Sequence, residues 1–215
     1  DAINTLSLTN NSYTDLAGNN GTAGTSSNYA VDTLAPSVSS FTIADSLLII
    51  GETATVTLVF SEAVAGFSSS ADIDNGSASG SLSTMSSSDN ITWTGTFTPA
   101  TNTEDATNTL SLANSYTDTA GNSGEAATTA NYAVETLAPT ISSIAITSSS
   151  GKQNNFLNAG DNVSMTVTYS ETVILDNTGG PPVLTIVVGS TEQETTYITG
   201  SNSDNLTFRY TFQAG

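Results

Sequence analysis

Residues 54–60 read Ala54-Thr-Val-Thr-Leu-Val-Phe60, with apolar side chains at 54, 56, 58 and 60 and threonines at 55 and 57. Successive side chains of a β-strand point to opposite faces of the sheet, so this spacing predicts a strand with one buried and one solvent-facing side. The stretch 91–98 follows the same rule, with Ile91, Trp93 and Phe97 set between threonines as core residues. The repeat around them shows no helical spacing, so the sequence predicts an all-β chain.

Long segments of the chain recur at fixed spacings. The matching pairs are 13–19 with 116–122, 28–36 with 131–139, 60–64 with 169–173 and 88–93 with 203–208. The first two pairs are 103 positions apart, the third 109 and the fourth 115. Strand-forming alternation recurs as well, since Val163, Met165, Val167 and Tyr169 take the places of the apolar residues of 54–60. Self-similarity on this scale indicates tandem structural repeats.

The repeats divide the chain into one complete unit and two partial ones. Residues 37–139 form the complete unit, 1–36 the end of a preceding one and 140–215 the start of a following one. The complete unit offers strand candidates, lettered A to G, at 38–43, 53–60, two short ones within 64–85, 91–98, 108–113 and 129–135. About seven short strands in a repeat of this length predict a β-sandwich of immunoglobulin-like size. Residues 1–36 then supply strands F and G, and residues 140–215 strands A to E.

Composition excludes most functions that need special side chains. Among 215 residues there are 2 Lys+Arg against 20 Asp+Glu, a net charge of −18, and neither histidine nor cysteine. These absences remove Ser-His and Cys-His catalysis, thiolate or imidazole metal sites and disulfides, so we expect no enzyme activity. The charge also disfavours nucleic acid and anionic membrane surfaces, and no apolar run is long enough for membrane insertion. Divalent cations are the partners that this charge favours.

The segments 60–64 (Phe-Ser-Glu-Ala-Val), 116–122 (Tyr-Thr-Asp-Thr-Ala-Gly-Asn) and 132–139 (Tyr-Ala-Val-Glu-Thr-Leu-Ala-Pro) resemble the bacterial Ig-like repeats of giant adhesins exported by type I secretion. The resemblance covers nearly the whole chain. It implies tandem immunoglobulin-like sandwiches on the bacterial surface that act as extracellular spacers stiffened by calcium. It also implies that binding to host-surface or matrix ligands is carried by other domains.

Strand parity places several acidic residues at one end of the complete repeat. If strand A runs away from the entry linker, the B–C, D–E and F–G loops all return to it. They carry Glu62, Asp89 and the pair Asp118 and Asn122, and Asp32 reaches the same end from the preceding repeat. No Lys or Arg occurs before position 152, so a cation is the available neutraliser. Hard oxygen ligands favour Ca²⁺, which predicts a calcium site here.

The second junction carries an equivalent set, Glu135, Glu171 and Asp204. For any single member of either set, the alternative is ordinary turn chemistry, because Asp and Asn side chains bond their own backbone in turns.

The sequence thus predicts an extracellular structural or adhesive segment, a calcium-stiffened rod or filament of bacterial biofilm surfaces. Its expected partners are neighbouring repeats or copies of itself, end to end. Two alternatives stay open. The first is a filament subunit, because Gly215 aligns with Ala100 and Asp1 with Asp105, so that strands A to E of one copy and F to G of the next would complete a sandwich. The second is a carbohydrate-binding module that uses its loop ends.

Overall fold

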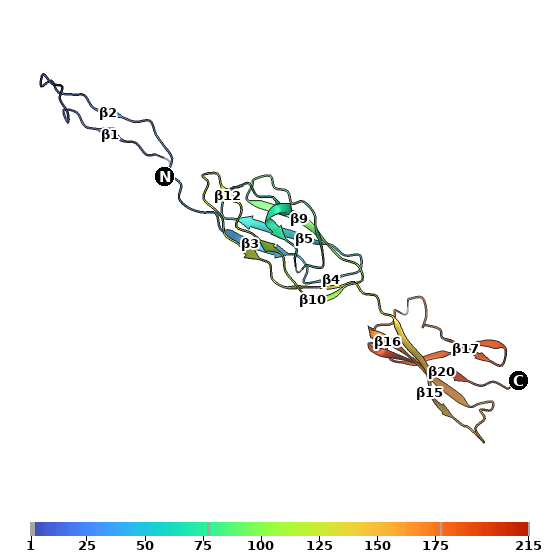
Figure 1. Ribbon diagram of the computed structural model, residues 1–215. Helices are drawn as coiled ribbons and strands as arrows, with labels where there is room; N and C mark the ends of the chain where they lie inside the picture. Colours follow the sequence, from blue (N-terminus) through green and yellow to red (C-terminus); the bar gives the residue numbers. More distant parts are fainter. Residues whose placement is uncertain (1–2, 77, 177, 215) are drawn as a thin grey trace. The chain divides into compact units, whose positions relative to one another are not determined.

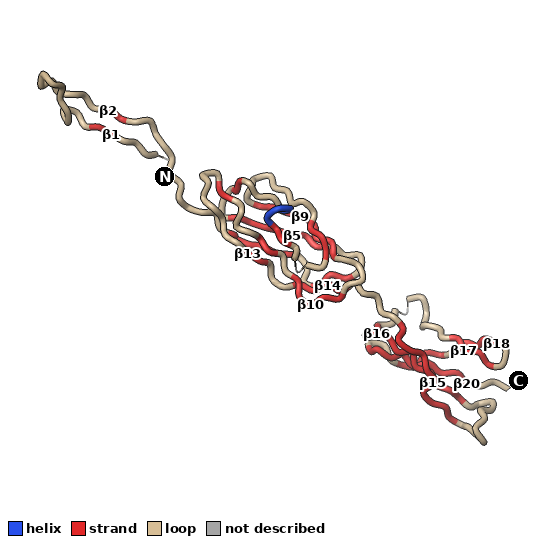
Figure 2. Tube along the Cα trace, viewed as in Figure 1, coloured by secondary structure: helices blue, strands red, loops and turns tan. Residues whose placement is uncertain are grey.

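The computed structural model describes residues 3–76, 78–176 and 178–214. Within these residues the regular elements are strands, apart from one short helix, α1 (Ser69–Asp72), drawn in blue in Figure 2. The predicted all-β fold is therefore confirmed. The chain divides into two compact units, residues 1–137 and 138–215, and each unit is described by itself.

The first layer of the complete repeat is a four-stranded antiparallel sheet in the order β3-β5-β9-β8, of which β3, β5 and β9 are labelled in Figure 1. Its strands are β3 (Val38–Ile43), β5 (Ala54–Phe60), β9 (Thr92–Pro99) and β8 (Gly80–Leu82). The inward residues of β5, at positions 54, 56, 58 and 60, are all buried, whereas Thr55 is exposed. The period-two alternation thus builds the sheet as the sequence predicts.

The second layer is built largely by residues 104–135, which pair with short strands from the first half of the repeat. One sheet joins β10 (Glu104–Asn108), β14 (Tyr132–Glu135) and β4 (Leu47–Ile49), with β4 parallel to β14. Another joins β13 (Ala127–Thr128), β11 (Ser111–Leu112) and β7 (Ile73–Asp74), and a third joins β12 (Thr117–Asp118) and β6 (Val64–Ala65). The strand predicted at 108–113 is therefore divided between the end of β10 and β11, whereas only residues 132–135 of the strand predicted at 129–135 form a strand, β14.

Asn108 explains why β10 is irregular near its end. Its side chain is fully buried, and the register of β10 shifts between Asp105 and Asn108. The Asn108 amide donates to the carbonyl oxygens of Asp105 (2.9 Å) and Tyr132 (3.2 Å), and its side-chain oxygen accepts from the Ser79 N–H (2.9 Å). The side chain therefore makes bonds that a regular ladder would otherwise make, which interrupts the strand.

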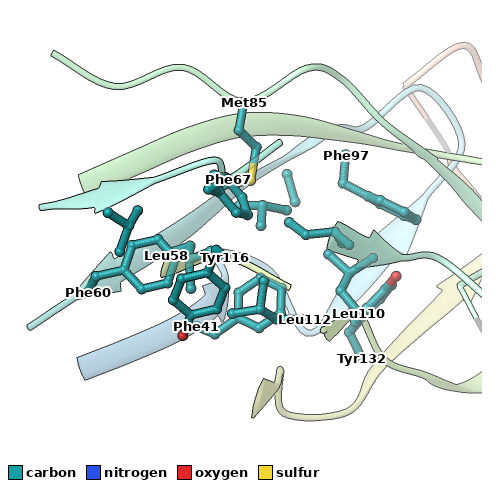
Figure 3. Packing of buried hydrophobic residues seen from close by; sticks show 14 of the residues in the cluster. Phe41, Leu58, Phe60, Phe67, Met85, Phe97, Leu110, Leu112, Tyr116 and Tyr132 are labelled. Atoms are coloured by element: carbon teal, nitrogen blue, oxygen red, sulfur yellow. The ribbon is translucent and has the colours of Figure 1, made fainter. Parts of the chain in front are cut away.

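The core lies between the two layers, and residues from both close it. Buried side chains of the first sheet, including Phe41, Phe60 and Phe97, form one cluster with Tyr116 and Tyr132 of the second layer (Figure 3). The aromatic rings pack edge-on or tilted, with centroids 4.7 Å apart for Phe60 and Tyr116 and 5.4 Å apart for Phe97 and Tyr132. Such contacts add to the burial of the rings, so the segment 104–135 is an integral part of the sandwich.

Residues 3–36 form a hairpin followed by a linker. The hairpin contains β1 (Ser7–Leu8) and β2 (Gly24–Thr25), which pair antiparallel. It corresponds to the segment 107–135 of the complete repeat, as the sequence predicts. The domain boundaries placed after residues 36 and 139 stay predictions, while the division into compact units falls between Leu137 and Ala138.

The second unit repeats the first layer of the complete repeat. Its main sheet has the order β15-β16-β20-β19, from β15 (Ile141–Ser150), β16 (Asn162–Val173), β20 (Ser203–Thr211) and β19 (Thr196–Thr199). A separate hairpin joins β17 (Thr185–Val188) and β18 (Thr191–Glu194). The buried cluster includes Val163, Met165 and Val167 of β16. Strand order and inward residues therefore both follow the repeat.

Candidate metal centre

Three acidic side chains meet at the entry end of the complete repeat. Asp32 lies in the linker, Glu62 follows β5, and Asp118 ends β12. One carboxylate oxygen of each lies within 4.8 Å of the others, although the residues are far apart in the sequence. Asp118 is buried, Glu62 half-buried and Asp32 exposed, so the cluster opens to solvent on the linker side.

The Asp118 carboxylate is held by the turn that follows it. Its Oδ1 accepts from the N–H groups of Ala120 (2.8 Å) and Asn122 (2.9 Å), and its Oδ2 accepts from the Asn122 side-chain amide (2.7 Å). These bonds, chiefly that from the Asn122 amide, lower the pKa of Asp118. Asp118 is therefore an ionised group whose position is fixed before any ligand arrives.

The same turn forms in the hairpin of residues 3–31. The Asp15 carboxylate accepts from the N–H groups of Ala17 (2.8 Å) and Asn19 (2.9 Å) and from the Asn19 amide (2.8 Å). Its pKa is lowered as well, with the Asn19 amide bond as the main cause. Because the hairpin lacks the rest of a sandwich, the motif Tyr-Thr-Asp-x-Ala-Gly-Asn encodes this turn locally.

Asn122 also connects the sandwich to the linker. Its side-chain amide lies 3.3 Å from the carbonyl oxygen of Asp32 and 3.2 Å from that of Leu34, and it donates to both. Asp32 in turn accepts from the Leu34 N–H at 3.1 Å, which shapes the linker next to the cluster. Asn122 thus acts in this structure as a clamp on the linker backbone.

The geometry and charge of the cluster suit a calcium ion. Two oxygens on opposite sides of a Ca²⁺ are about 4.6–5.2 Å apart, because each Ca–O bond is about 2.3–2.6 Å long. The three carboxylate oxygens all lie within 4.8 Å of one another and so fit inside that span. The sequence offers no Lys or Arg before Lys152 to neutralise them. Asp32, Glu62 and Asp118 would hold the ion, and calcium would supply the missing positive charge.

Asp89 lies at the predicted end of the repeat but outside the carboxylate cluster. Its loop lies beside β6, since the Val64 N–H donates to the carbonyl oxygen of Asn90 at 3.0 Å. The Asp89 Oδ1 accepts from the N–H groups of Thr92 (2.8 Å) and Ile91 (2.9 Å), which lower its pKa. Asp118 makes the same kind of turn bonds, so these bonds do not decide the role of Asp89, and its part in a calcium site stays a prediction.

The second predicted set is divided between the two units. Glu135 ends β14 in the first unit and accepts from the Leu137 N–H at 3.1 Å, the same arrangement that Asp32 makes with Leu34. Glu171 lies on β16 and Asp204 on β20 of the second unit. A calcium site formed by these three residues stays a prediction.

Glu125 is a residue of the entry end that sequence reasoning missed. Its carboxylate accepts from the N–H of Val38, the first residue of β3, at 3.1 Å, and so ties residues 104–135 to the first sheet. The equivalent position of the preceding repeat is Thr22, so the repeat gave no signal for an acid here.

Comparisons with known proteins agree with this architecture. A sequence model of the bacterial Ig-like domain matches residues 32–134, a segment that contains Asp32, Glu62 and Asp118. No curated protein and no solved structure matches the chain. Among the described residues, no helix has the length and apolar character needed to cross a membrane.

Proposed function

Residues 32–134 form a bacterial Ig-like domain, and on that premise we propose that this chain is a calcium-stiffened spacer in a rod on the bacterial surface. Domains of this family are typically extracellular or surface repeat modules. The proposed role is structural, with neighbouring repeats as partners. The chain has neither histidine nor cysteine, which removes the Ser-His and Cys-His pairs of nucleophilic catalysis.

The observation that carries the proposal is the carboxylate cluster between linker and sandwich. Asp32 belongs to the linker, whereas Glu62 and Asp118 belong to the sandwich, and their oxygens lie within 4.8 Å. Without a cation the three negative charges repel one another, which opposes the hydrogen bonds of Asn122 to the linker. An ion bound by all three holds the linker against the sandwich, so calcium converts a flexible connection into a rigid one.

The expected affinity suits an extracellular setting. Calcium sites of extracellular modules commonly have dissociation constants of about 10⁻⁴ to 10⁻³ M. At about 100 times the dissociation constant, one bound ion stabilises the bound form by roughly 2.7 kcal/mol. Intracellular calcium would leave such a site empty, so stiffening would begin only after export.

Calcium titration of the full chain by NMR tests the site. The backbone amides of Ala120 and Asn122, which bond Asp118, should shift saturably with a dissociation constant in the range above. Glu62→Gln removes one proposed ligand charge and should weaken binding several-fold. Glu192→Gln, an exposed change on β18 of the second unit, makes the same change in net charge and should leave these shifts unaltered. The absence of a saturable shift up to about 10 mM, ten times the weakest expected constant, would contradict the site.

Stiffening is tested separately by small-angle X-ray scattering with calcium and with chelator. Calcium should narrow the distribution of distances within the molecule in the wild type and in Glu192→Gln. The effect should be smaller in Glu62→Gln. A chain that binds calcium in the titration and yet scatters identically in chelator has a calcium site that does not stiffen it.

The carbohydrate-binding alternative gains no support from the one tryptophan of the chain. Trp93 is partly buried, and its ring packs edge-on against Phe67 with centroids 4.8 Å apart. A sugar platform needs an exposed aromatic face, whereas Trp93 packs against the core.

A further inference from the structure

Ser61, the residue after β5, holds the first residue of the complete repeat with its side chain. The Ser61 N–H donates to the carbonyl oxygen of Ser37 at 2.9 Å, as expected for an antiparallel pair. The return bond goes to the side chain, because the Ser37 N–H donates to the Ser61 hydroxyl oxygen, also at 2.9 Å. A hydroxyl group therefore takes the place of a backbone acceptor at the point where the linker enters the sandwich.

The second unit contains the same arrangement at the equivalent positions. The Ser170 N–H donates to the carbonyl oxygen of Thr140 at 2.8 Å, and the Thr140 N–H donates to the Ser170 hydroxyl oxygen at 2.9 Å. Each serine is the second residue of a repeated segment, 60–64 or 169–173, and stands directly before a glutamate. Because the bond recurs in both units, it is a property of the repeat and not of one loop.

Asn122 holds the other end of the linker. Its side-chain amide donates to the carbonyl oxygens of Asp32 (3.3 Å) and Leu34 (3.2 Å). The linker is thus bound at its beginning by Asn122 and at its end, through Ser37, by Ser61. These bonds join groups of the protein directly and need no ion. We refer to Ser61 and Asn122 together as the linker latch.

The linker latch and the carboxylate cluster act on the linker in opposite directions when no ion is bound. Asp32 is the member of the cluster that belongs to the linker, and its charge is repelled by those of Glu62 and Asp118, whose carboxylate oxygens lie within 4.8 Å of its own. A hydrogen bond and a pair of partly solvated charges have comparable strength. The linker is therefore divided between a docked state, in which the latch bonds are formed, and a free state.

We infer that Ser61 is a positioning residue of the calcium site, because its hydroxyl group keeps the linker docked and Asp32 within reach of the ion. Only the docked linker presents all three carboxylates, so the apparent dissociation constant is the intrinsic one divided by the docked fraction. Loss of one latch bond should lower the ratio of docked to free linker by about fivefold, and should weaken calcium binding by at most the same factor. The effect on calcium affinity rests on the proposed function, whereas the effect on the linker does not.

NMR relaxation of the full chain in chelator measures the order of the linker without calcium. Ser61 is the member of the latch to change, because Asn122 also bonds the Asp118 carboxylate. Ser61→Ala removes the acceptor, so the heteronuclear NOE of the amides of residues 33–35 should fall below the wild-type values. Ser61→Thr keeps a hydroxyl group and should restore them. The matched control is Ser81→Ala, which changes an exposed serine of β8, at the opposite edge of the first sheet from β3, and should leave the linker unchanged.

Calcium titration of the same variants provides the second readout. The dissociation constant, followed at the amides of Ala120 and Asn122, should rise in Ser61→Ala as the docked fraction falls, and should return toward the wild-type value in Ser61→Thr. Urea unfolding followed by the fluorescence of Trp93 checks that every variant keeps a folded sandwich.

Two results would overturn the inference about Ser61. The first is a Ser61→Ala variant whose linker is as ordered in chelator as that of the wild type, whether or not the chain binds calcium. The second is a linker that becomes clearly looser in Ser61→Ala while the dissociation constant for calcium stays the same. A wild type that binds no calcium would instead contradict the proposed function, and the loosening of the linker in chelator would still be expected.

Discussion

Tyr116 and Tyr132 are both fully buried in one core, but their hydroxyl groups are satisfied to different degrees. The Tyr116 hydroxyl donates to the carbonyl oxygen of Glu125 at 2.9 Å and accepts from its N–H at 3.2 Å. The Tyr132 hydroxyl makes no hydrogen bond within the described part of the chain. Its burial, with a smaller contribution from the charge of Asp105, raises the pKa of Tyr132 to about 12. Phenylalanine removes the same oxygen from each site, so the two substitutions form a matched pair.

The two substitutions should change stability in opposite directions. Tyr116→Phe loses a satisfied hydrogen bond and should lower the free energy of unfolding by about 1 kcal/mol. Tyr132→Phe removes a buried polar group that pays a desolvation cost of about 1–3 kcal/mol without a partner, so it should raise that free energy. For a domain of this size, 1 kcal/mol shifts the melting temperature by about 4–8 °C. The two variants should therefore melt on opposite sides of the wild type.

Trp93 reports on this repeat selectively. It is the one tryptophan of the chain, and it packs against Phe67 at the edge of the same core. Urea unfolding at fixed calcium, followed by tryptophan fluorescence, therefore measures residues 37–137 without interference from the second unit. A Tyr132→Phe variant that loses as much stability as Tyr116→Phe would show that the Tyr132 hydroxyl is hydrogen-bonded, and would refute the reasoning.

Two further predictions concern the turns of the repeat. Gly124→Ala places a Cβ 2.1 Å from the Tyr116 ring and should lower the free energy of unfolding by roughly 1–3 kcal/mol in the tryptophan-monitored assay. Gly21→Ala meets the half-exposed Tyr13, which can move aside, and it lies outside residues 37–137, so it should leave this assay unchanged. The pKa of Asp89 is lowered in the fold, so its contribution to stability is complete above its unfolded pKa of about 3.9 and is lost as pH falls through the folded value. Asp89→Asn keeps an acceptor oxygen but cannot titrate. Its free energy of unfolding should therefore fall less than that of the wild type between about pH 5 and 3. Equal losses of free energy in the two proteins would show that titration of Asp89 is not the cause.

The regular strands were readable from the sequence because each has one face in the core. β3 begins at the predicted residue, whereas β5 and β9 each begin one residue later than predicted. β4 was not predicted, because Leu47–Ile49 is a short apolar run without alternation, and its pairing with β14 is between distant segments. The break at Asn108 was equally hidden, since a side chain that replaces backbone bonds looks like any loop asparagine.

Part of the candidate site followed from topology alone. Strand parity brought Asp32, Glu62 and Asp118 to one end of the sandwich, and the structure places them together. Parity placed Asp89 at the same end, but it lies outside the cluster of three carboxylates, and its role as a ligand stays a prediction. Parity also passed over Glu125, whose role depends on a single bond to the first residue of β3.

The parallel pairing of β4 with β14 has a mechanical consequence for the repeat. β4 lies near the beginning of the repeat and β14 near its end, and Ala133, Val134 and Glu135 lie opposite Leu47, Leu48 and Ile49. Tension along the chain pulls such neighbours lengthwise past each other, so their hydrogen bonds carry the load together and not one after another. An antiparallel hairpin pulled at its two ends, such as β17 with β18, instead opens like a zipper. The hydrogen bonds of these three residue pairs are therefore loaded in shear, and they must break together before a stretched repeat can extend.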